Sequence, residues 1–299
     1  MPSPKIIFIG GSSSLFGIDA AEVQKSLGIP ALNFGLHAGL RLEDHLANAC
    51  SVAKPGDIVI LCLEPAYYDY YTETWTTWTL RNALAWNRSS LDSLSFKRRL
   101  EIYLKSSDPS ISWDLIETKA TEGVFSKEIA LREKALEPAQ AIVTRYLSEQ
   151  GTSRTFSYKL SNLDSNGDLL NARNIGLPFH GDAYSASRPA SISSYAKNQL
   201  VPFLKQMKKD HVRVIFDYTP YLVYGKPDGN WQKADANFKA NLNGLGGELL
   251  ETRAAFFYPN TFFFNSNLHL NEAGKQVRTQ TLIEALRKKL NLNPAPSPR

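Results

Sequence analysis

Cysteine is scarce in this sequence, and no long hydrophobic run is present. Only two of the 299 residues are cysteines, Cys50 and Cys62, which excludes the disulfide framework typical of small secreted domains. No segment approaches the roughly 18 consecutive apolar residues that a transmembrane helix needs. We expect both cysteines to be small apolar core residues, Cys50 in a helix and Cys62 in a buried strand.

Motifs that hold metals, cofactors or nucleic acids are missing as well. The five histidines form no HxH or HExxH pattern and no cluster with the cysteines, so no metal site is predicted. The chain has no P-loop, and Asn33 stands where a dinucleotide-binding fold carries an acidic ribose partner. The net charge of +5 is spread over short clusters, without a nucleic-acid-binding signature. We therefore predict no cofactor and no nucleic-acid partner, and a nucleotide-binding protein is the least favoured alternative.

Apolar runs alternate with amphipathic helical segments at both ends of the chain. Ile58 to Leu63 is a continuous apolar run, as expected for a parallel strand that is covered on both faces. Strands are predicted at residues 5–9, 31–34, 58–63, 212–217 and 262–264, and helices at 19–27, 42–53, 195–208, 237–245 and 272–290. This alternation predicts an α/β fold in which helices flank a doubly wound parallel sheet, as in a flavodoxin-like three-layer sandwich.

The middle of the chain, about residues 67–190, loses this alternation. We interpret it as a mainly helical insertion, with helices near 91–105 and 127–147, within a single domain that spans residues 1–299. A turn is predicted at Asn166-Gly-Asp168. The insertion opens with a series of aromatic residues, Tyr67, Tyr68, Tyr70, Tyr71, Trp75, Trp78 and Trp86. These form either a sugar-stacking surface or, as we favour, the seam along which the insertion packs.

The most informative segment is the strand at residues 5–9 and the Gly-Gly-Ser-Ser-Ser sequence that follows it. Ser12 stands at the carboxyl edge of the predicted sheet, beside backbone N–H groups that have no helical partner. Such a position suits a nucleophile next to an oxyanion site. An ordinary strand-to-helix turn with a serine N-cap has the same sequence, and this alternative stays open.

A second informative segment precedes the last predicted helix and contains His269. A histidine at the carboxyl edge of the sheet can reach a serine on the first strand. Its imidazole, with a pKa near about 6.5, can accept the serine proton and return it to a leaving group. The alternative is a loop histidine that caps or packs the helix.

Together these segments resemble the SGNH (GDSL-like) hydrolase superfamily. Gly10-Gly-Ser12 stands where that family has Gly-Asp-Ser, Asn33 to Gly39 is similar to its second block, and His269 to Gly274 is similar to its last block. The resemblance covers about residues 5–70 and 195–290. It is greatest to exported, often membrane-anchored bacterial members that accompany acyl transfer onto cell-envelope polymers, as in exopolysaccharide O-acetylation and teichoic-acid D-alanylation.

The resemblance implies a serine-dependent O-acyl (acetyl) esterase or acyltransferase that acts on a cell-envelope or extracellular polysaccharide. Ser12 would be the nucleophile and His269 the general base. The backbone N–H groups of Ser12 and of Gly39 or Ala38 would bind the oxyanion. The implied substrate is an acylated glycan or a small ester. The implied partner is a membrane-bound acyltransferase or an export complex.

Some positions depart from the family pattern. The family places Asp three residues before the histidine, where this chain has Ser266 next to Asn265, and either could orient the ring. Glu64 follows the third strand in place of the third block's asparagine; it could hydrogen-bond within the site, orient His269, repel an oxyanion or lie on the surface. His37 could touch substrate or bond the local backbone.

These departures keep a second function open, a catalytically degenerate SGNH-like protein that binds glycan or serves an export complex. We expect a periplasmic or other extracytoplasmic location if an N-terminal anchor has been removed, and a cytoplasmic one otherwise.

Overall fold

The computed structural model describes residues 2–69, 75, 79–80, 91, 94–105, 144, 147–157, 159–173, 178–227 and 229–292. Contacts divide the chain into two compact units, one made of Met1–Thr72 with Gly151–Arg299 and one made of Glu73–Gln150. The smaller unit lies within the predicted insertion, whereas residues 151–190 are grouped with the larger unit.

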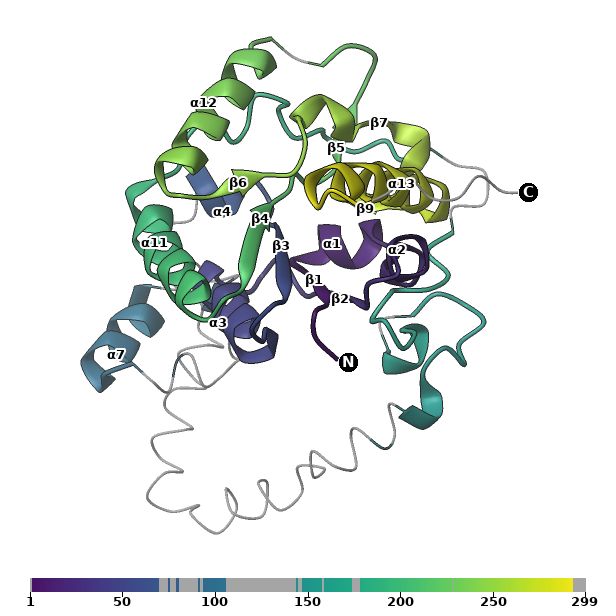
Figure 1. The fold of residues 1–299 in the computed structure, drawn as a ribbon. Coiled ribbons are helices and arrows are strands. Elements are labelled where there is room, and N and C mark those ends of the chain that lie inside the picture. The colour runs from purple at the N-terminus through teal and green to yellow at the C-terminus, as the bar shows by residue number, and fades with distance from the viewer. Residues whose placement is uncertain are drawn as a thin grey trace. The chain divides into compact units, whose positions relative to one another are not determined.

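The larger unit is built on a five-stranded parallel sheet with the strand order β2-β1-β3-β4-β6 (Figure 1). Its strands are β1 (Ile6–Gly10), β2 (Ala31–Gly35), β3 (Ile58–Cys62), β4 (Arg213–Phe216) and β6 (Glu248–Leu249). This order is that of a doubly wound sheet, so the predicted α/β fold class is confirmed. Every residue of β1 is buried, as expected for a central strand with helices on both faces.

Helices pack against both faces of this sheet. The larger unit contains α1 (Ser12–Gly17), α2 (Ala20–Leu27), α3 (Leu42–Val52), α4 (Ala66–Asp69), α11 (Ser194–Lys209), α12 (Trp231–Gly244) and α13 (Glu272–Lys289). Helices α1, α2 and α13 pack together, and α3 packs with α11 on the opposite side (Figure 1). The smaller unit contains α7 (Phe96–Lys105).

Local capping residues explain why several boundaries follow the predictions. The Asp19 side chain accepts the Glu22 N–H at the start of α2, and Gly28 ends that helix in the left-handed conformation with φ of 69°. At the start of α13, the Asn271 side chain accepts the N–H of Gly274 at 3.0 Å. Each cap satisfies helix-end groups within a few residues of sequence, so it can be recognised without tertiary information.

Short elements and one cysteine differ from the predictions. The last predicted strand becomes β8 (Phe263–Ser266), which pairs antiparallel with β9 (His269–Leu270) outside the main sheet. A further parallel pair joins β5 (Tyr221–Val223) to β7 (Phe257–Pro259).

Helix α12 begins at Trp231, six residues before its predicted start, because it extends over a polar segment. The prediction that Cys50 is a core residue is wrong, because it lies on the solvent side of α3; Cys62 is buried as predicted.

The first aromatic residues of the predicted insertion are core residues. Tyr67 and Tyr68 are buried in the core of the sheet-containing unit. Trp75 is buried in the separate core of the smaller unit, with Ile102 and Tyr103 of α7. Burial of these rings favours packing over sugar stacking. Tyr70, Tyr71, Trp78, Trp86 and most of the predicted 127–147 helix lie outside the described residues.

The predicted Asn166-Gly-Asp168 turn holds the first α/β unit together. Leu163 and Leu169 pair across it, and Gly167 has φ of 80°. The Asp168 carboxylate accepts the N–H groups of Ala20 and Ala21 at 2.8 and 2.9 Å, which caps α2 from a distant segment. The turn thus fixes the amino end of α2 to the edge of the sheet.

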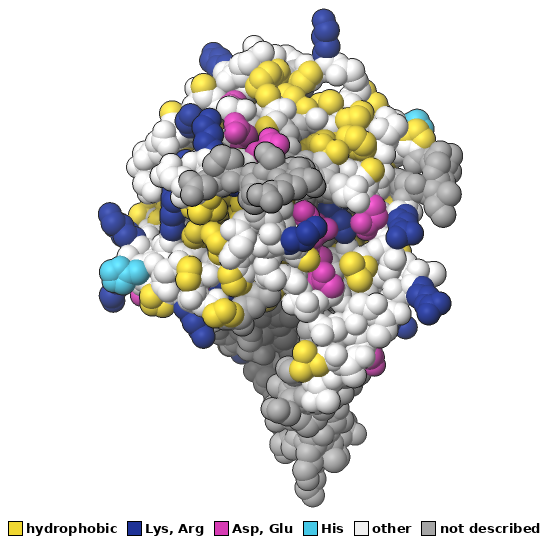
Figure 2. Space-filling model, turned by 45° about the vertical axis from the view of Figure 1, so that its right-hand side comes forward, with side chains coloured by type: hydrophobic (Ala, Val, Ile, Leu, Met, Phe, Trp, Pro, Cys, Tyr) yellow, Lys and Arg dark blue, Asp and Glu magenta, His cyan; other side chains and the backbone are white. Residues whose placement is uncertain are grey.

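Two further properties concern the described residues as a group. None of the described helices has both the length and the apolar character of a membrane span. In the face drawn in Figure 2, Lys and Arg side chains are scattered among apolar and acidic ones and do not gather in one patch.

Candidate active site

Ser12 lies at the switch point of the doubly wound sheet. It follows β1, whose neighbours β2 and β3 lie on opposite sides, so the chain leaves β1 and β3 in opposite directions. Crevices that bind ligands form at such points, at the carboxyl ends of the strands. Glu64 follows β3 at the same edge, and the loop at 36–40 follows β2.

The three consecutive serines differ in burial and bonding. Ser13 and Ser14 are fully buried. The Ser13 hydroxyl donates to Glu64 Oε1 at 2.9 Å, and the Ser14 hydroxyl donates to the Cys62 carbonyl at 3.3 Å. Ser12 is half-buried, and within the described part of the chain its hydroxyl makes no hydrogen bond. Of the three, Ser12 alone offers an accessible, uncommitted hydroxyl.

Gly10 and Gly11 are required by close approach rather than by an unusual backbone conformation. Gly11 has φ of −83°, which any residue can adopt. A Cβ atom at position 11 would collide with the Glu64 carboxylate, and one at position 10 would collide with the Cys62 carbonyl and the Ser14 hydroxyl. The glycine pair therefore lets β3 and its following residue lie directly against the turn that presents Ser12.

Glu64 is a buried residue of the site and not a surface glutamate. Its side chain is 3% exposed, and Oε1 accepts both the Ser13 N–H at 3.2 Å and the Ser13 hydroxyl. Among the described residues, its Oε2 has no hydrogen-bond partner. Burial raises the pKa of this carboxyl, although the donated hydrogen bonds oppose the rise. Of the predicted roles, hydrogen bonding within the site is the one that the contacts support.

His269 lies against α1, the helix that begins at Ser12. Its imidazole stacks on the ring of Phe16, with centroids 4.0 Å apart and planes at 5°. Phe156 and Phe264 complete an aromatic cluster around Phe16, at 5.9 and 6.0 Å. Burial, together with the nearby His37, lowers the pKa of His269 to about 4. The ring is therefore neutral at neutral pH.

Asn265 lies next to the imidazole of His269. Its Oδ1 lies 2.7 Å from His269 Nδ1. The Ser266 hydroxyl instead accepts the N–H of Leu268 at 3.2 Å. Because a carbonyl oxygen only accepts, Nδ1 carries the proton and Nε2 presents its lone pair. Asn265 thus sets the tautomer that a general base requires.

The loop after β2 is held by a hydrogen bond within the loop and by contacts to the Tyr67 side chain. The N–H of Gly39 donates to His37 Nδ1 at 2.9 Å. The Tyr67 hydroxyl lies 2.9 Å from the Ala38 carbonyl and 2.7 Å from the Leu40 carbonyl. The buried His45 contacts the same hydroxyl through Nε2 at 3.0 Å. His37 therefore bonds the local backbone, and Gly39 would have to leave His37 to serve as an oxyanion donor.

Arg278 belongs to this region but gives no signal in the sequence. It is fully buried on α13, and its Nη1 donates to the Ser13 carbonyl at 3.0 Å. Its Nη2 donates to the Tyr218 carbonyl at 3.0 Å and lies 3.4 Å from Asp217 Oδ2. An arginine in a polar helical segment is normally solvent-exposed, so only the tertiary contacts identify it.

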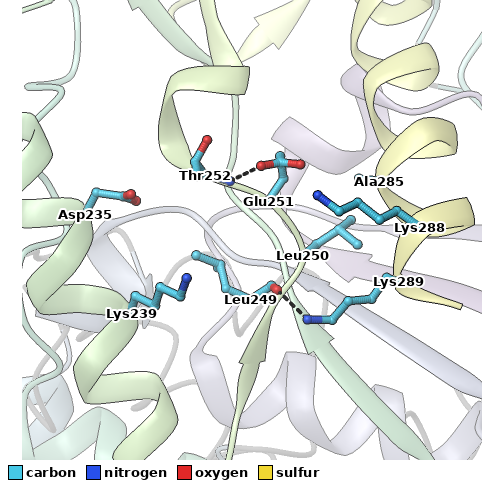
Figure 3. Close-up of a pocket in the computed structure, with 9 residues that line it drawn as sticks. All are labelled: Asp235, Lys239, Leu249, Leu250, Glu251, Thr252, Ala285, Lys288 and Lys289. Atoms are coloured by element: carbon cyan, nitrogen blue, oxygen red, sulfur yellow. Dashed lines mark hydrogen bonds between the residues drawn. The ribbon is translucent and has the colours of Figure 1, made fainter. Parts of the chain in front are cut away.

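A separate pocket of about 350 Å³ lies at the carboxyl end of β6, between α12 and α13 (Figure 3). Lysines from both helices line it, and Lys289 donates to the Leu249 carbonyl at 3.0 Å. Neither Ser12 nor His269 contributes to this pocket.

Comparison with known proteins identifies no relative. The sequence matches no protein-family model, and no curated protein is significantly similar to it. Among the described residues, no group of three or more His, Cys, Asp and Glu side chains is arranged to hold a metal ion.

Proposed function

We propose that the protein is a serine-dependent O-acyl esterase or acyltransferase with Ser12 as nucleophile and His269 as general base. The observation that carries the proposal is the stacking of His269 on α1, with Nδ1 bonded to Asn265. This arrangement brings a neutral, correctly protonated imidazole from residue 269 to the helix that starts at residue 12. Ser12 would be the nucleophile, His269 the base, and Asn265 the group that orients the base, as in serine–histidine catalysis.

The reaction would proceed in two steps, acylation of Ser12 and deacylation. Ser12 Oγ adds to the ester carbonyl carbon while its proton passes to His269 Nε2. The oxyanion then collapses and expels the alcohol, which takes up that proton, and the acyl group stays on Ser12. Water or an acceptor hydroxyl then attacks the acyl-enzyme, with His269 accepting and returning a proton again.

The backbone provides candidates for oxyanion stabilisation. The N–H of Ser12 lies in the first turn of α1, where helical partners are missing. The N–H of Gly39 would join it after release from His37. Each such donor is typically worth about 10²–10³ in rate.

The substrate class follows from the sequence resemblance and not from the geometry. The resemblance of residues 10–12, 33–39 and 269–274 to SGNH hydrolases is greatest to members that accompany acyl transfer onto cell-envelope polymers. We propose an acylated polysaccharide as substrate and a membrane-bound acyltransferase or export complex as partner.

A non-catalytic role is the second candidate, and one observation favours it. The Gly39 N–H is engaged by His37, and the Ser12 hydroxyl has no bond to His269 among the described residues. A degenerate protein that binds glycan would tolerate this arrangement. An enzyme would have to rearrange locally on binding substrate, which is common in unliganded catalytic sites.

Labelling with a fluorophosphonate probe tests the proposed function. The probe forms a phosphonate ester with an activated serine and releases fluoride, and mass spectrometry locates the adduct. We expect an adduct on Ser12 that is lost in Ser12→Ala and at least about 100-fold slower in His269→Ala. Ser14→Ala is the matched control, because its hydroxyl is buried against the Cys62 carbonyl.

Ester hydrolysis and glycan binding separate the two candidates. Turnover of a p-nitrophenyl acetate substrate that Ser12→Ala abolishes supports the enzyme. An unlabelled Ser12, no turnover, and wild-type glycan binding by the Ser12→Ala/His269→Ala protein would instead support the binding role.

A further inference from the structure

The polar groups of Ser13 are all bonded to ionisable side chains. Its N–H and hydroxyl donate to Glu64 Oε1, and its carbonyl accepts from Arg278 Nη1. We propose that Glu64 and Arg278 form a clamp on Ser13 that positions the neighbouring Ser12 for reaction. This inference rests on the proposed function, since it assigns two positioning residues to the same site.

Glu64 holds the amino side of the Ser13 residue. It reaches the turn from the end of β3, and the lack of a side chain at Gly11 lets its carboxylate lie directly against the backbone. Its buried position excludes competing water. The Ser13 N–H and hydroxyl both donate to the same Glu64 oxygen, so Glu64 fixes the backbone and the side chain of Ser13 together.

Arg278 holds the carboxyl side of the same residue. The guanidinium is fixed by Asp217 and by the Tyr218 carbonyl, both at the end of β4. Gly17 leaves room for it, because a Cβ atom there would come within 2.5 Å of Arg278 Nη1. The first turn of α1 is thereby connected to α13 and to the central sheet.

The two charges act on one residue in complementary directions. Glu64 accepts a hydrogen bond from the Ser13 N–H, and the Arg278 guanidinium donates one to the Ser13 carbonyl, so a rotation of either peptide would lose a hydrogen bond. Ser12 shares a peptide bond with Ser13, and among the residues that the structure describes its hydroxyl has no hydrogen-bond partner. The clamp then sets where the Ser12 backbone lies, and a misplacement of about 1 Å in a reacting group can cost about 100-fold in rate.

Rates of Ser12 labelling by the fluorophosphonate probe test the clamp, measured at several probe concentrations to separate binding from reaction. We expect Glu64→Ala to slow the reaction step about 10- to 100-fold without weakening probe binding. Glu64→Gln keeps an accepting oxygen and should restore most of the rate. Ser13→Ala should be slowed several-fold, whereas the matched control Ser14→Ala should stay within about twofold of wild type.

Hydrogen exchange of the peptide at residues 10–17 provides a readout that does not depend on activity. We expect faster exchange in Glu64→Ala and Ser13→Ala than in Ser14→Ala. Folded Glu64→Ala protein that labels and exchanges like wild type would overturn the clamp. If Glu64→Ala does not fold, equal labelling and exchange rates in Ser13→Ala and Ser14→Ala would overturn it instead. Equal losses in Glu64→Ala and Glu64→Gln would also overturn it.

The failures of the two proposals are distinguishable. Wild-type protein that does not label at Ser12 contradicts the proposed function. In that case, the exchange comparison still decides whether Glu64 holds the Ser12 turn.

Discussion

The imidazole of His269 lies flat on the ring of Phe16, with centroids 4.0 Å apart and planes at 5°. This contact joins segments more than 250 residues apart, because Phe16 belongs to the helix that begins at Ser12 and His269 precedes the last helix. The ring face excludes water from one side of the imidazole. It thereby contributes to the burial that keeps His269 neutral.

Replacement of Phe16 should change both stability and the titration of His269. Phe16 is buried, so Phe16→Ala should lower the free energy of unfolding by about 3–5 kcal/mol. The loss of the stacked ring should also raise the pKa of His269 from about 4 toward its ordinary value. Chemical denaturation and an NMR titration of the imidazole measure the two effects. Phe16→Leu, which keeps an apolar cover, should show smaller changes in both, and an unchanged pKa in Phe16→Ala would contradict this account.

Replacement of Asn265 by aspartate should raise the pKa of His269. A carboxylate beside Nδ1 favours the imidazolium, so the acidic limb of the kcat/KM profile should move upward by about one pH unit or more. Asn265→Ala should lower kcat/KM at least about tenfold, because the ring loses its tautomer restraint. The matched control is Asn267→Ala, since that amide donates to the Asp182 carbonyl instead. A similar response of the two alanine variants would argue against an orienting role.

His45 should make the protein less stable as the pH falls from about 6.5 to 4. Burial lowers its pKa to about 4, with the nearby His37 acting in the same direction, and it is fully buried. The unfolded chain takes up a proton below about pH 6.5, whereas the folded protein does not, so stability present at pH 7 is lost on acidification. The full effect is about 3 kcal/mol.

Comparison with His45→Gln isolates this contribution. The buried Asp217 and Asp168 carboxyls have pKa values raised by burial to about 6 and about 7, and they change stability in the opposite direction. Denaturation at pH 4 to 7 should show the destabilisation caused by His45→Gln shrinking as the pH falls. A constant difference over this range would refute the assignment.

Removal of Arg278 should destabilise the protein more at pH 8 than at pH 5. Arg278→Met leaves the fully buried Asp217 without its cation, which typically costs about 3–5 kcal/mol. Burial raises the pKa of Asp217 to about 6, and Arg278 limits the rise. Without Arg278, the Asp217 carboxyl should therefore stay protonated up to a higher pH. A raised folded-state pKa gives stability that is present at low pH and lost as the pH rises. Asp217→Asn in the same variant should remove this pH dependence in urea denaturation.

The long elements of the fold were predictable because their signals are local. The buried runs of β1 and β3 and the caps Asp19, Gly28 and Asn271 act within a few residues of sequence. The two-residue strand β6 has no such signal, because it exists only through its pairing with β4. The exposed side of α3 at Cys50 was also missed, since a cysteine is usually buried.

The contacts of the candidate site could not be predicted from the sequence. Local sequence pointed to Ser12 and His269, but it could not distinguish Asn265 from Ser266 as the histidine's partner. That choice depends on the β8–β9 pairing, which directs the Asn265 side chain to the imidazole and leaves Ser266 on a backbone N–H. Arg278 was missed because its partners come from α1 and from the end of β4.

The sequence by itself determined the alternation of strands and helices and the placing of a serine after the first strand and a histidine before the last helix. These features depend on apolar periodicity and on caps that act between neighbouring residues. Only the tertiary structure decided which serine keeps an uncommitted hydroxyl, because Glu64 and the Cys62 carbonyl engage Ser13 and Ser14 from β3 across the sheet edge. Hydrogen bonds between segments distant in the chain depend on how the sheet is assembled, and no local pattern specifies them.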